Sequence, residues 1–356
     1  MCGIAGYLCP EGLLEPEPVL RRMLGSIRHR GPDEFGIYQA SQAALASARL
    51  SIIDLSGGQQ PISNEDGSLW IVFNGEIFNY LELRRDLDAR GHRLATNTDT
   101  EVVLHLFEDL GPDCLRQLNG QFAIAIWDKK RKQLFLARDR VGVRPLFYTR
   151  INNALVFASE IKALLEYPGV SAEMDPGALR EVFTYWSTLS PRTCFNGIFE
   201  LPPGSFLTAS PGAAPEVRAW WELDFQEDSP SRTLEDYLDE FRALLRDATR
   251  LRLRADVPVG AYLRGGLDST TFARQFAALE RATPAEIAAH QQRRLDAALR
   301  AAGLPPTDLA QLATLPLLDK ATLRAREAEA GPRPRGARRL ATSGTSGSPT
   351  VVWQDR

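Results

Sequence analysis

Short apolar runs, each bounded by turn residues, recur along the first 221 of the 356 residues. Such runs predict β-strands, because alternating or continuous apolar residues suit a partly or fully buried sheet. They cover residues 48–54, 69–74, 122–127, 133–137 and 155–158. Helical spacing covers 18–28 and 80–90, and a third helix is expected to begin after Asp99. Strands with helices inserted between groups of them predict layered α+β sheets, not β-α-β repeats.

The pattern changes twice further along the chain. A proline-rich, polar link at 202–232 precedes an expected amphipathic helix, where Thr233 and Asp236 have the spacing of a capping box. An apolar strand is expected at 257–263. After about residue 276, Ala and Arg dominate and no strand pattern remains. The expected segments are therefore 2–221, 233–276 and 277–356.

Composition argues against several classes of protein. The net charge of −3 gives no basis for binding nucleic acid or a membrane surface. No apolar run approaches the ~20 residues of a membrane span, and the N-terminus does not resemble a secretory signal. The cysteines lack CxxC spacing and fit a reducing, cytoplasmic compartment. The histidines do not pair at i, i+4, so no metal site is expected.

Cys2 follows Met1 and begins the sequence Cys2-Gly3-Ile4. We expect Met1 to be removed, since methionine is readily cleaved before a small residue, and Cys2 then gains a free α-amine. An α-amine with a pKa of about 7.7–8.0 can act as the base that activates a thiol. A cysteine placed after Met1 by chance is the alternative, and Cys2 alone does not distinguish the two.

Seven motifs follow Cys2 in order. They are RHRGPD at 28–33, RLSIID at 49–54, NGEIFNY at 74–80, TDTE at 98–101, GQFA at 120–123, ARDRVG at 137–142 and FASEIK at 157–162. This series resembles the class II glutamine amidotransferases, most closely the glutaminase half of the asparagine synthetase B family, over residues 2 to about 221. The resemblance implies an N-terminal-nucleophile hydrolase fold, an αββα sandwich with two antiparallel sheets between helical layers.

The resemblance also implies a glutamine site. Cys2 is the expected nucleophile, and Asn74 with the backbone N–H of Gly75 is the expected oxyanion hole. Arg49 is expected to pair with the α-carboxylate of glutamine, because a guanidinium offers two parallel hydrogen bonds. Asp99 and the region of Glu76 are expected to hold the α-ammonium. The full expected glutamine-binding set is Arg49, Leu50, Ile53, Asn74, Gly75, Glu76 and Asp99.

Three of these features have structural interpretations as well. Asn74-Gly75 is also the usual composition of a type I′ hairpin turn. The glycine at 75 is expected to let the backbone approach substrate without a Cβ clash. Arg49 begins an apolar run, where a charge needs a partner. Arg138-Asp139-Arg140 is expected to form an ion-pair cluster that stabilises the fold.

An apolar run, a double-glycine turn and an expected helix form a strand–loop–helix unit around residues 257–276. Backbone N–H groups in such a loop bind phosphate well. It resembles the pyrophosphate loop of asparagine synthetases, which implies ATP with Mg²⁺ as cofactor, and none for the glutaminase. The family loop begins with serine, where this chain has Arg264. The unit is expected to be a truncated α/β pyrophosphate-loop unit, because the about 80 residues at 277–356 are too few to form the rest of a synthetase domain. Its expected binding residues are Leu263, Gly265, Gly266, Asp268 and Ser269.

Residues 277–356 are expected to form a helical tail. They resemble the N-terminal segment of phenylacetate-CoA ligase-like adenylating enzymes, mainly through LPLLDK at 315–320 and the Ser/Thr/Gly loop at 342–350. The resemblance implies a chimera joined near residue 276. A flexible polar tail from 342 to 356 is the alternative.

Three functions remain open from the sequence. The first is glutamine hydrolysis to glutamate and ammonia at Cys2, within an asparagine synthetase type enzyme that uses ATP to amidate aspartate. The second is the glutaminase alone, with ammonia passing to another acceptor or a partner subunit. The third is a non-functional truncated fusion. The expected partners are the small molecules glutamine and aspartate, with a homodimer or an ammonia-accepting partner as the expected assembly, and neither nucleic acid nor membrane.

Overall fold

The computed structural model describes residues 1–12, 15–225, 232–259, 338–341 and 351–354. The chain divides into two compact units, Met1–Tyr262 and Leu263–Arg356. In the second unit the described part is a two-stranded antiparallel sheet, formed by β13 (Arg338–Ala341) and β14 (Val351–Gln354).

Two six-stranded sheets form the centre of the first unit, and all their strand pairs are antiparallel. The first sheet has the order β10-β8-β9-β1-β3-β2 and the second the order β12-β11-β7-β6-β5-β4. The first sheet contains β1 (Gly3–Leu8), β2 (Glu34–Gln39), β3 (Ala43–Arg49), β8 (Phe147–Ile151), β9 (Ala154–Ala158) and β10 (Ile198–Glu200). The second contains β4 (Ile62–Ser63), β5 (Leu69–Ile77), β6 (Gly120–Asp128), β7 (Gln133–Arg138), β11 (Ser205–Ala209) and β12 (Glu216–Ala219).

The helices of the first unit differ in how they begin. Thr98 is the N-cap of α3 (Asp99–Leu110), and its hydroxyl accepts a hydrogen bond from the Glu101 backbone N–H at 3.2 Å. The helix α6 starts with the predicted capping box of Thr233 and Asp236. The described helices are α1 (Pro16–Ser26), α2 (Tyr80–Arg90), α3 (Asp99–Leu110), α4 (Ile161–Leu164), α5 (Pro176–Tyr185), α6 (Leu234–Leu251) and the 3₁₀ helices Arg28–Arg30 and Gly111–Gln117.

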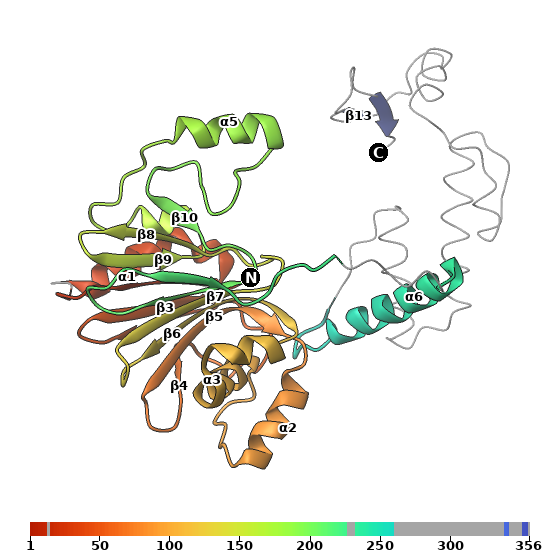
Figure 1. Cartoon of the computed structure of the whole chain (residues 1–356), viewed down its shortest axis with the longest axis horizontal. Coiled ribbons are helices and arrows are strands. Elements are labelled where there is room, and N and C mark those ends of the chain that lie inside the picture. The colour runs from red at the N-terminus through yellow and green to blue at the C-terminus, as the bar shows by residue number, and fades with distance from the viewer. Residues whose placement is uncertain (13–14, 226–231, 260–337, 342–350, 355–356) are drawn as a thin grey trace. The chain divides into compact units, whose positions relative to one another are not determined.

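Three apolar clusters define four layers. One joins α1 to the outer face of the first sheet, through residues such as Met23 and Tyr7. A second lies between the sheets, and a third joins α2 and α3 to the second sheet, through residues such as Leu104 and Phe73. Figure 1 shows α2 and α3 beside β5 on the far side from α1. The helix–sheet–sheet–helix order is the predicted αββα sandwich.

Two strand predictions are wrong, at least in part. The run at 48–54 was expected to be a strand, but β3 ends at Arg49 and Asp54 has a left-handed backbone with φ of 50°. The run at 257–263 was also expected to be a strand, but residues 257–259 are not in one, and 260–263 lie outside the described residues. The run at 48–54 is apolar, yet the hydrogen bonds of Arg49 to the carbonyls of Ile53 and Asp54 hold it in a loop.

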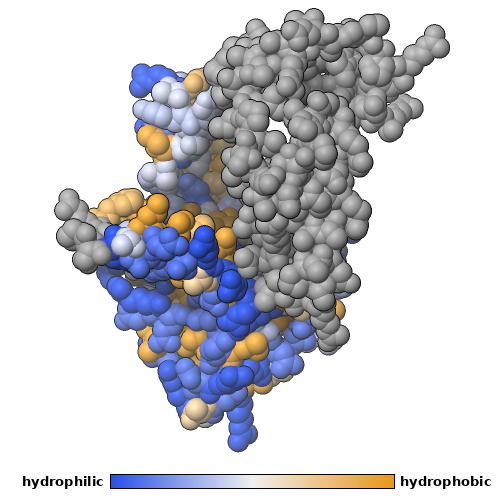
Figure 2. Space-filling model, turned by 90° about the vertical axis from the view of Figure 1, so that its right-hand side faces the viewer, coloured by the Kyte–Doolittle hydropathy of each residue, from blue (hydrophilic) through white to orange (hydrophobic). Residues whose placement is uncertain are grey.

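The described part of one face is mixed in hydropathy. Figure 2 shows mostly hydrophilic residues over the lower part of the described surface, with apolar groups scattered among them. Among the helices that the structure describes, none is long and apolar enough to cross a lipid bilayer.

Candidate active site

A pocket forms where the ends of β3 and β5 meet the N-terminus and the first turn of α3. It contains all the residues that the sequence predicts for the nucleophile, the oxyanion hole and the glutamine site. Its lining is Met1, Cys2, Arg49, Leu50, Ile52, Ile53, Gly58, Gln60, Phe73, Asn74, Gly75, Glu76, Thr98, Asp99, Thr100 and Arg144. The functional roles of these residues remain predictions, but the fold brings them together from five separate stretches of sequence.

Hydrogen bonds from Leu50 and Arg30 hold Cys2 in the pocket. Its Sγ accepts a hydrogen bond from the Leu50 N–H at 3.4 Å, and its carbonyl accepts one from Arg30 Nε at 2.9 Å. Arg30 is itself paired with Glu160 at 2.9 Å. Burial raises the pKa of the Cys2 thiol, while the hydrogen bond with Leu50 opposes the rise. The thiol is therefore mostly protonated at neutral pH, and it needs a base before it can attack.

Asn74 is fully buried inside β5, and neither its amide nitrogen nor its amide oxygen has a hydrogen-bond partner in the described chain. The hairpin-turn interpretation is wrong, because Asn74 and Gly75 pair with Ala123 and Phe122 in the middle of the β5–β6 ladder. A Cβ on Gly75 would lie 2.3 Å from the carbonyl oxygen of Gln121. The close approach that requires glycine here is therefore to β6.

Arg49 ends β3 with its side chain almost fully buried. Its guanidinium pairs with Glu34 at 2.8 Å and donates to the carbonyls of Ile53 and Asp54 at 2.9 and 2.7 Å. These bonds hold the loop after β3 in place and use three of the five N–H groups of a guanidinium. The partner that a buried cation needs is thus present, and two N–H groups remain for a ligand.

Two carboxylates form an acidic wall in the pocket. Asp99, in the first turn of α3, accepts a hydrogen bond from the Ile77 N–H at 2.9 Å, and burial raises its pKa to about 6. Burial, together with the neighbouring Asp99, raises the pKa of Glu76 to about 7. Both groups are held where a bound cation would favour their ionised forms.

Arg144 also lines the pocket, and it is not among the predicted site residues. Asp139 positions its loop by accepting hydrogen bonds from the backbone N–H groups of Val143 and Arg144 at 2.9 and 3.0 Å. Burial lowers the pKa of Arg144, and its Nε has no hydrogen-bond partner among the described residues. The only hint in the sequence is that Arg144 follows the ARDRVG motif by two residues.

The expected ion-pair cluster Arg138-Asp139-Arg140 is different in detail. Arg138 pairs with Glu200 at 2.6 Å and donates to several carbonyls, while Arg140 donates to the carbonyl of Leu118 at 2.6 Å. Asp139 accepts from backbone N–H groups. The role is structural, as expected, but it rests mainly on backbone contacts.

The segment after α6 contacts the loop that lines the pocket. The Asp256 carboxylate accepts a hydrogen bond from the Asp54 N–H at 2.7 Å, and the Asp256 N–H donates to the Ile52 carbonyl at 3.0 Å. Arg254 pairs with Glu82 of α2 at 2.6 Å. These contacts connect the start of the second predicted segment to the wall of the pocket.

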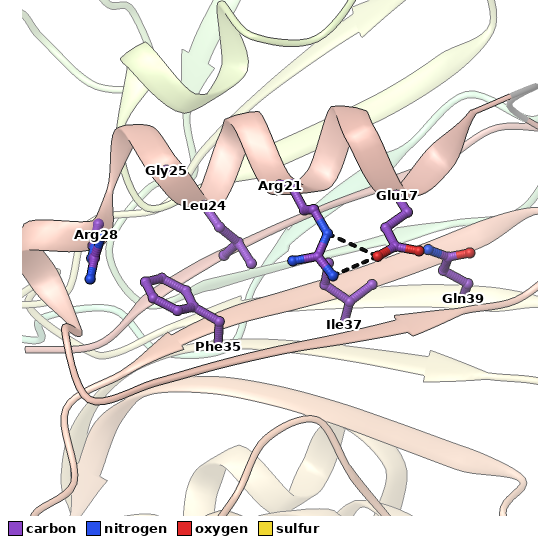
Figure 3. A pocket seen from close by; sticks show the side chains of 8 residues that line it. All are labelled: Glu17, Arg21, Leu24, Gly25, Arg28, Phe35, Ile37 and Gln39. Carbon is purple, nitrogen blue, oxygen red and sulfur yellow. Dashed lines mark hydrogen bonds and ion pairs between the residues drawn. The ribbon is translucent and has the colours of Figure 1, made fainter.

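A second pocket, of about 590 Å³, lies between α1 and the edge strand β2. Figure 3 shows the ion pair of Arg21 and Glu17 running along α1 beside it, with Phe35 and Leu24 also lining it. Glu17 and Arg21 are exposed and paired along the helix, and Arg28 lies over the Phe35 ring at 5.8 Å. The pocket contains no nucleophile, so it offers no chemistry comparable to the first pocket.

The expected pyrophosphate loop lies outside the described residues, as does most of segment 277–356. This covers Leu263, Arg264, Gly265, Gly266, Asp268 and Ser269.

Comparison with known proteins identifies two regions. Residues 1–221 match the glutamine amidotransferase domain, and residues 240–304 match asparagine synthase. Glutamine-hydrolysing asparagine synthetase 3 of Bacillus subtilis is 37% identical over 274 residues, which are 76% of this chain and 44% of the relative. Amidase chyE of Penicillium rubens is 35% identical over 295 residues, 79% of this chain and 43% of the relative. The chain therefore spans less than half the length of these relatives.

Among solved structures, glutamine phosphoribosylpyrophosphate amidotransferase from B. subtilis is 22% identical with a TM-score of 0.45, covering 62% of this chain and 49% of that one. The amidotransferase match covers more than half of the chain, and the pocket with Cys2 lies within it. The chain belongs to the glutamine amidotransferase domain family.

Proposed function

We propose that this chain hydrolyses glutamine to glutamate and ammonia with Cys2 as the nucleophile. The observation that carries the proposal is that a thiol and an unsatisfied buried amide, those of Cys2 and Asn74, line the same pocket. A buried amide without hydrogen bonds is costly in the free protein. When the thiol attacks a substrate amide, the oxyanion formed on the amide oxygen would supply the missing acceptor for the Asn74 amide nitrogen.

Charges of opposite sign give the pocket a direction. The unused N–H groups of Arg49 are on Nε and Nη1, so they do not form a parallel pair, and each can donate singly to the α-carboxylate of glutamine. Asp99 and Glu76, with pKa values of about 6 and about 7, suit the α-ammonium, because the ammonium stabilises their ionised forms. The α-carboxylate and α-ammonium lie at the same end of glutamine, so holding both fixes that end and leaves the side-chain amide to extend toward the remaining functional group, Cys2.

The reaction follows from these groups. The α-amine of Cys2, free once Met1 is removed, takes the thiol proton, and the sulfur forms a bond to the side-chain amide carbon of glutamine. Asn74 and the Gly75 N–H stabilise the resulting oxyanion. The C–N bond breaks and ammonia leaves with the proton from the amine. Water then attacks the thioester, which releases glutamate and restores the thiol.

Covalent trapping tests the assignment of the nucleophile. A diazo-ketone analogue of glutamine should attach once to each Met1-processed chain, as measured by mass spectrometry. Peptide mapping should place the attached group on Cys2. The other thiols, such as the buried Cys9 and Cys114, are internal controls. Labelling at any other residue, or none when glutamine is hydrolysed, would contradict the assignment.

We further propose that the ammonia is transferred to aspartate in a reaction that uses ATP with Mg²⁺. The support is the asparagine synthase match at 240–304 and the names of several relatives. A different acceptor is the competing proposal, supported by the relatives named as amidases. Asparagine formed only with ATP and aspartate supports the first. Glutamate release that ignores both would favour a glutaminase that supplies another acceptor or a partner subunit.

A further inference from the structure

Outside the glutamine site, the fold gathers four potential metal ligands. Glu65 lies in the turn between β4 and β5, His92 follows α2, and His105 and Glu108 are one turn apart on α3. One candidate ligand atom from each residue lies within 4.8 Å of all the others. Two imidazoles and two carboxylates are a donor set that suits Zn²⁺ and similar divalent transition metals.

His105 is the feature that points to a missing ligand. Its side chain is fully buried, yet neither ring nitrogen has a hydrogen-bond partner within the described residues. Its Nδ1 faces carboxylate oxygens of Glu108 at 3.4 Å and Glu65 at 3.6 Å, which are too distant for good hydrogen bonds. A buried imidazole without hydrogen bonds is costly. A cation between these three atoms could bond to each of them.

Both histidines also have carboxylates on their other side. Nε2 of His92 is 3.0 Å from Asp109 Oδ1, which leaves Nδ1 as its available nitrogen. Nε2 of His105 is 3.7 Å from Glu101 Oε1, and the backbone N–H groups of Ala95 and Thr96 hold that carboxylate. Metal-binding histidines commonly have such outer carboxylates, which fix the tautomer and orientation of the ring.

The geometry requires only a small closure. Zinc bonds of about 2.0–2.2 Å in a tetrahedron place neighbouring donor atoms about 3.4 Å apart. The present separations reach 4.8 Å, so the outer donors must move inward by about 1 Å. The side chains of Glu65 and Glu108 are 45% and 34% exposed and can rotate, whereas His105 is fixed in the core.

We propose that Glu65, His92, His105 and Glu108 bind one divalent transition-metal ion, with Zn²⁺ as the best match. The ion would join the β4–β5 turn and the chain after α2 to α3. The backbone fixes the position of His92. The left-handed Gly91 ends α2, and the His92 N–H donates to the carbonyl of Leu87 at 3.2 Å. The site is structural and lies on the helix that carries Asp99 at its start.

Metal binding to the full-length, untagged chain tests the proposal. The chain should carry Cys2→Ala, so that the pocket thiol does not bind zinc. After chelator treatment and dialysis, we expect calorimetry to give one equivalent of Zn²⁺ and the melting temperature to rise. Co²⁺ in place of Zn²⁺ should give the visible absorption of a tetrahedral site with nitrogen and oxygen ligands.

Variants at the partly exposed ligands keep the test independent of folding. His92→Gln and Glu108→Gln should each weaken zinc binding by tenfold or more and remove the Co²⁺ spectrum, with unchanged circular dichroism. Asp109→Asn should weaken binding about 10- to 100-fold through the orientation of His92. His29→Gln, at an exposed histidine outside the cluster, is the matched control. Absence of zinc binding, or equal binding in His92→Gln and the control, would overturn the proposal in favour of a charged His105 among carboxylates.

Discussion

Replacing Asp99 with Asn should change how the stability of the ligand-free protein depends on pH. The Asp99 carboxylate is only 5% exposed, and burial raises its pKa from the ordinary 3.8 to about 6. At 1.36 kcal/mol per pH unit, that difference corresponds to about 3 kcal/mol. Because part of this cost is shared with Glu76, whose pKa Asp99 also raises, we take about 3 kcal/mol as an upper value.

The sign follows from the direction of the change. A carboxyl whose folded-state pKa is raised contributes stability that is fully present below 3.8 and is lost as the pH rises through about 6. The free energy of unfolding of the wild type should therefore fall relative to that of Asp99→Asn between about pH 4 and about pH 7, by up to about 3 kcal/mol. Carboxylates that do not interact with Asp99 contribute equally to both proteins and cancel in the difference, whereas the share of Glu76 is included in the upper value.

Urea unfolding of the two proteins at a series of pH values measures this difference. Asp86→Asn, at an exposed position of α2, is the matched control and should follow the wild type. The same Asp99→Asn variant should raise the KM for glutamine about 10- to 100-fold, since a hydrogen bond to a charged group contributes about 1.5–3 kcal/mol. A difference in stability that stays flat with pH, or that has the opposite sign, would refute the reasoning about burial.

Three further predictions concern other parts of the site. In Gly58→Ala the new Cβ would lie 2.3 Å from Arg49 Nη2, so the KM for glutamine should rise at least about tenfold. Gly25→Ala, with nothing within 4 Å on an exposed part of α1, should leave KM unchanged and stabilise by up to about 1 kcal/mol in thermal unfolding. Asn74→Ala should lower kcat about 10²- to 10³-fold with little change in KM. A rise in KM of similar size with kcat unchanged would argue against an oxyanion role. Arg254→Ala, which removes the ion pair with Glu82, should destabilise the protein by at most about 1 kcal/mol, and steady-state kinetics should show whether the pocket loop responds.

The sequence was most informative where local rules and ordered motifs agree. The helix at 80–90 and the capping box at Thr233 are present as predicted, because periodicity and capping are local properties. The strand expected at 48–54 fails at Arg49, because the bonds of that guanidinium to Ile53 and Asp54 fold the chain into a loop. An apolar run does not reveal such a contact.

Tertiary contacts also explain what the sequence missed. Arg144 reaches the pocket because Asp139 holds the intervening loop by its backbone N–H groups. His92 and His105 are 13 positions apart and fit no ligand spacing, but the packing of α2 on α3 brings their ring centres to 4.9 Å. Asn74-Gly75 looked like a turn because residue type alone does not show that a strand continues through it.

The most direct test of the account is glutamate release from glutamine by the Met1-processed protein, compared with Cys2→Ala. Cys2→Ala deletes only the sulfur, whose hydrogen-bond partner in the structure is Leu50, so the variant should fold like the wild type. We predict release by the processed protein and none above background in the variant. Equal release by both, or no release by folded protein whose N-terminal residue is shown to be Cys2, would contradict the central claim.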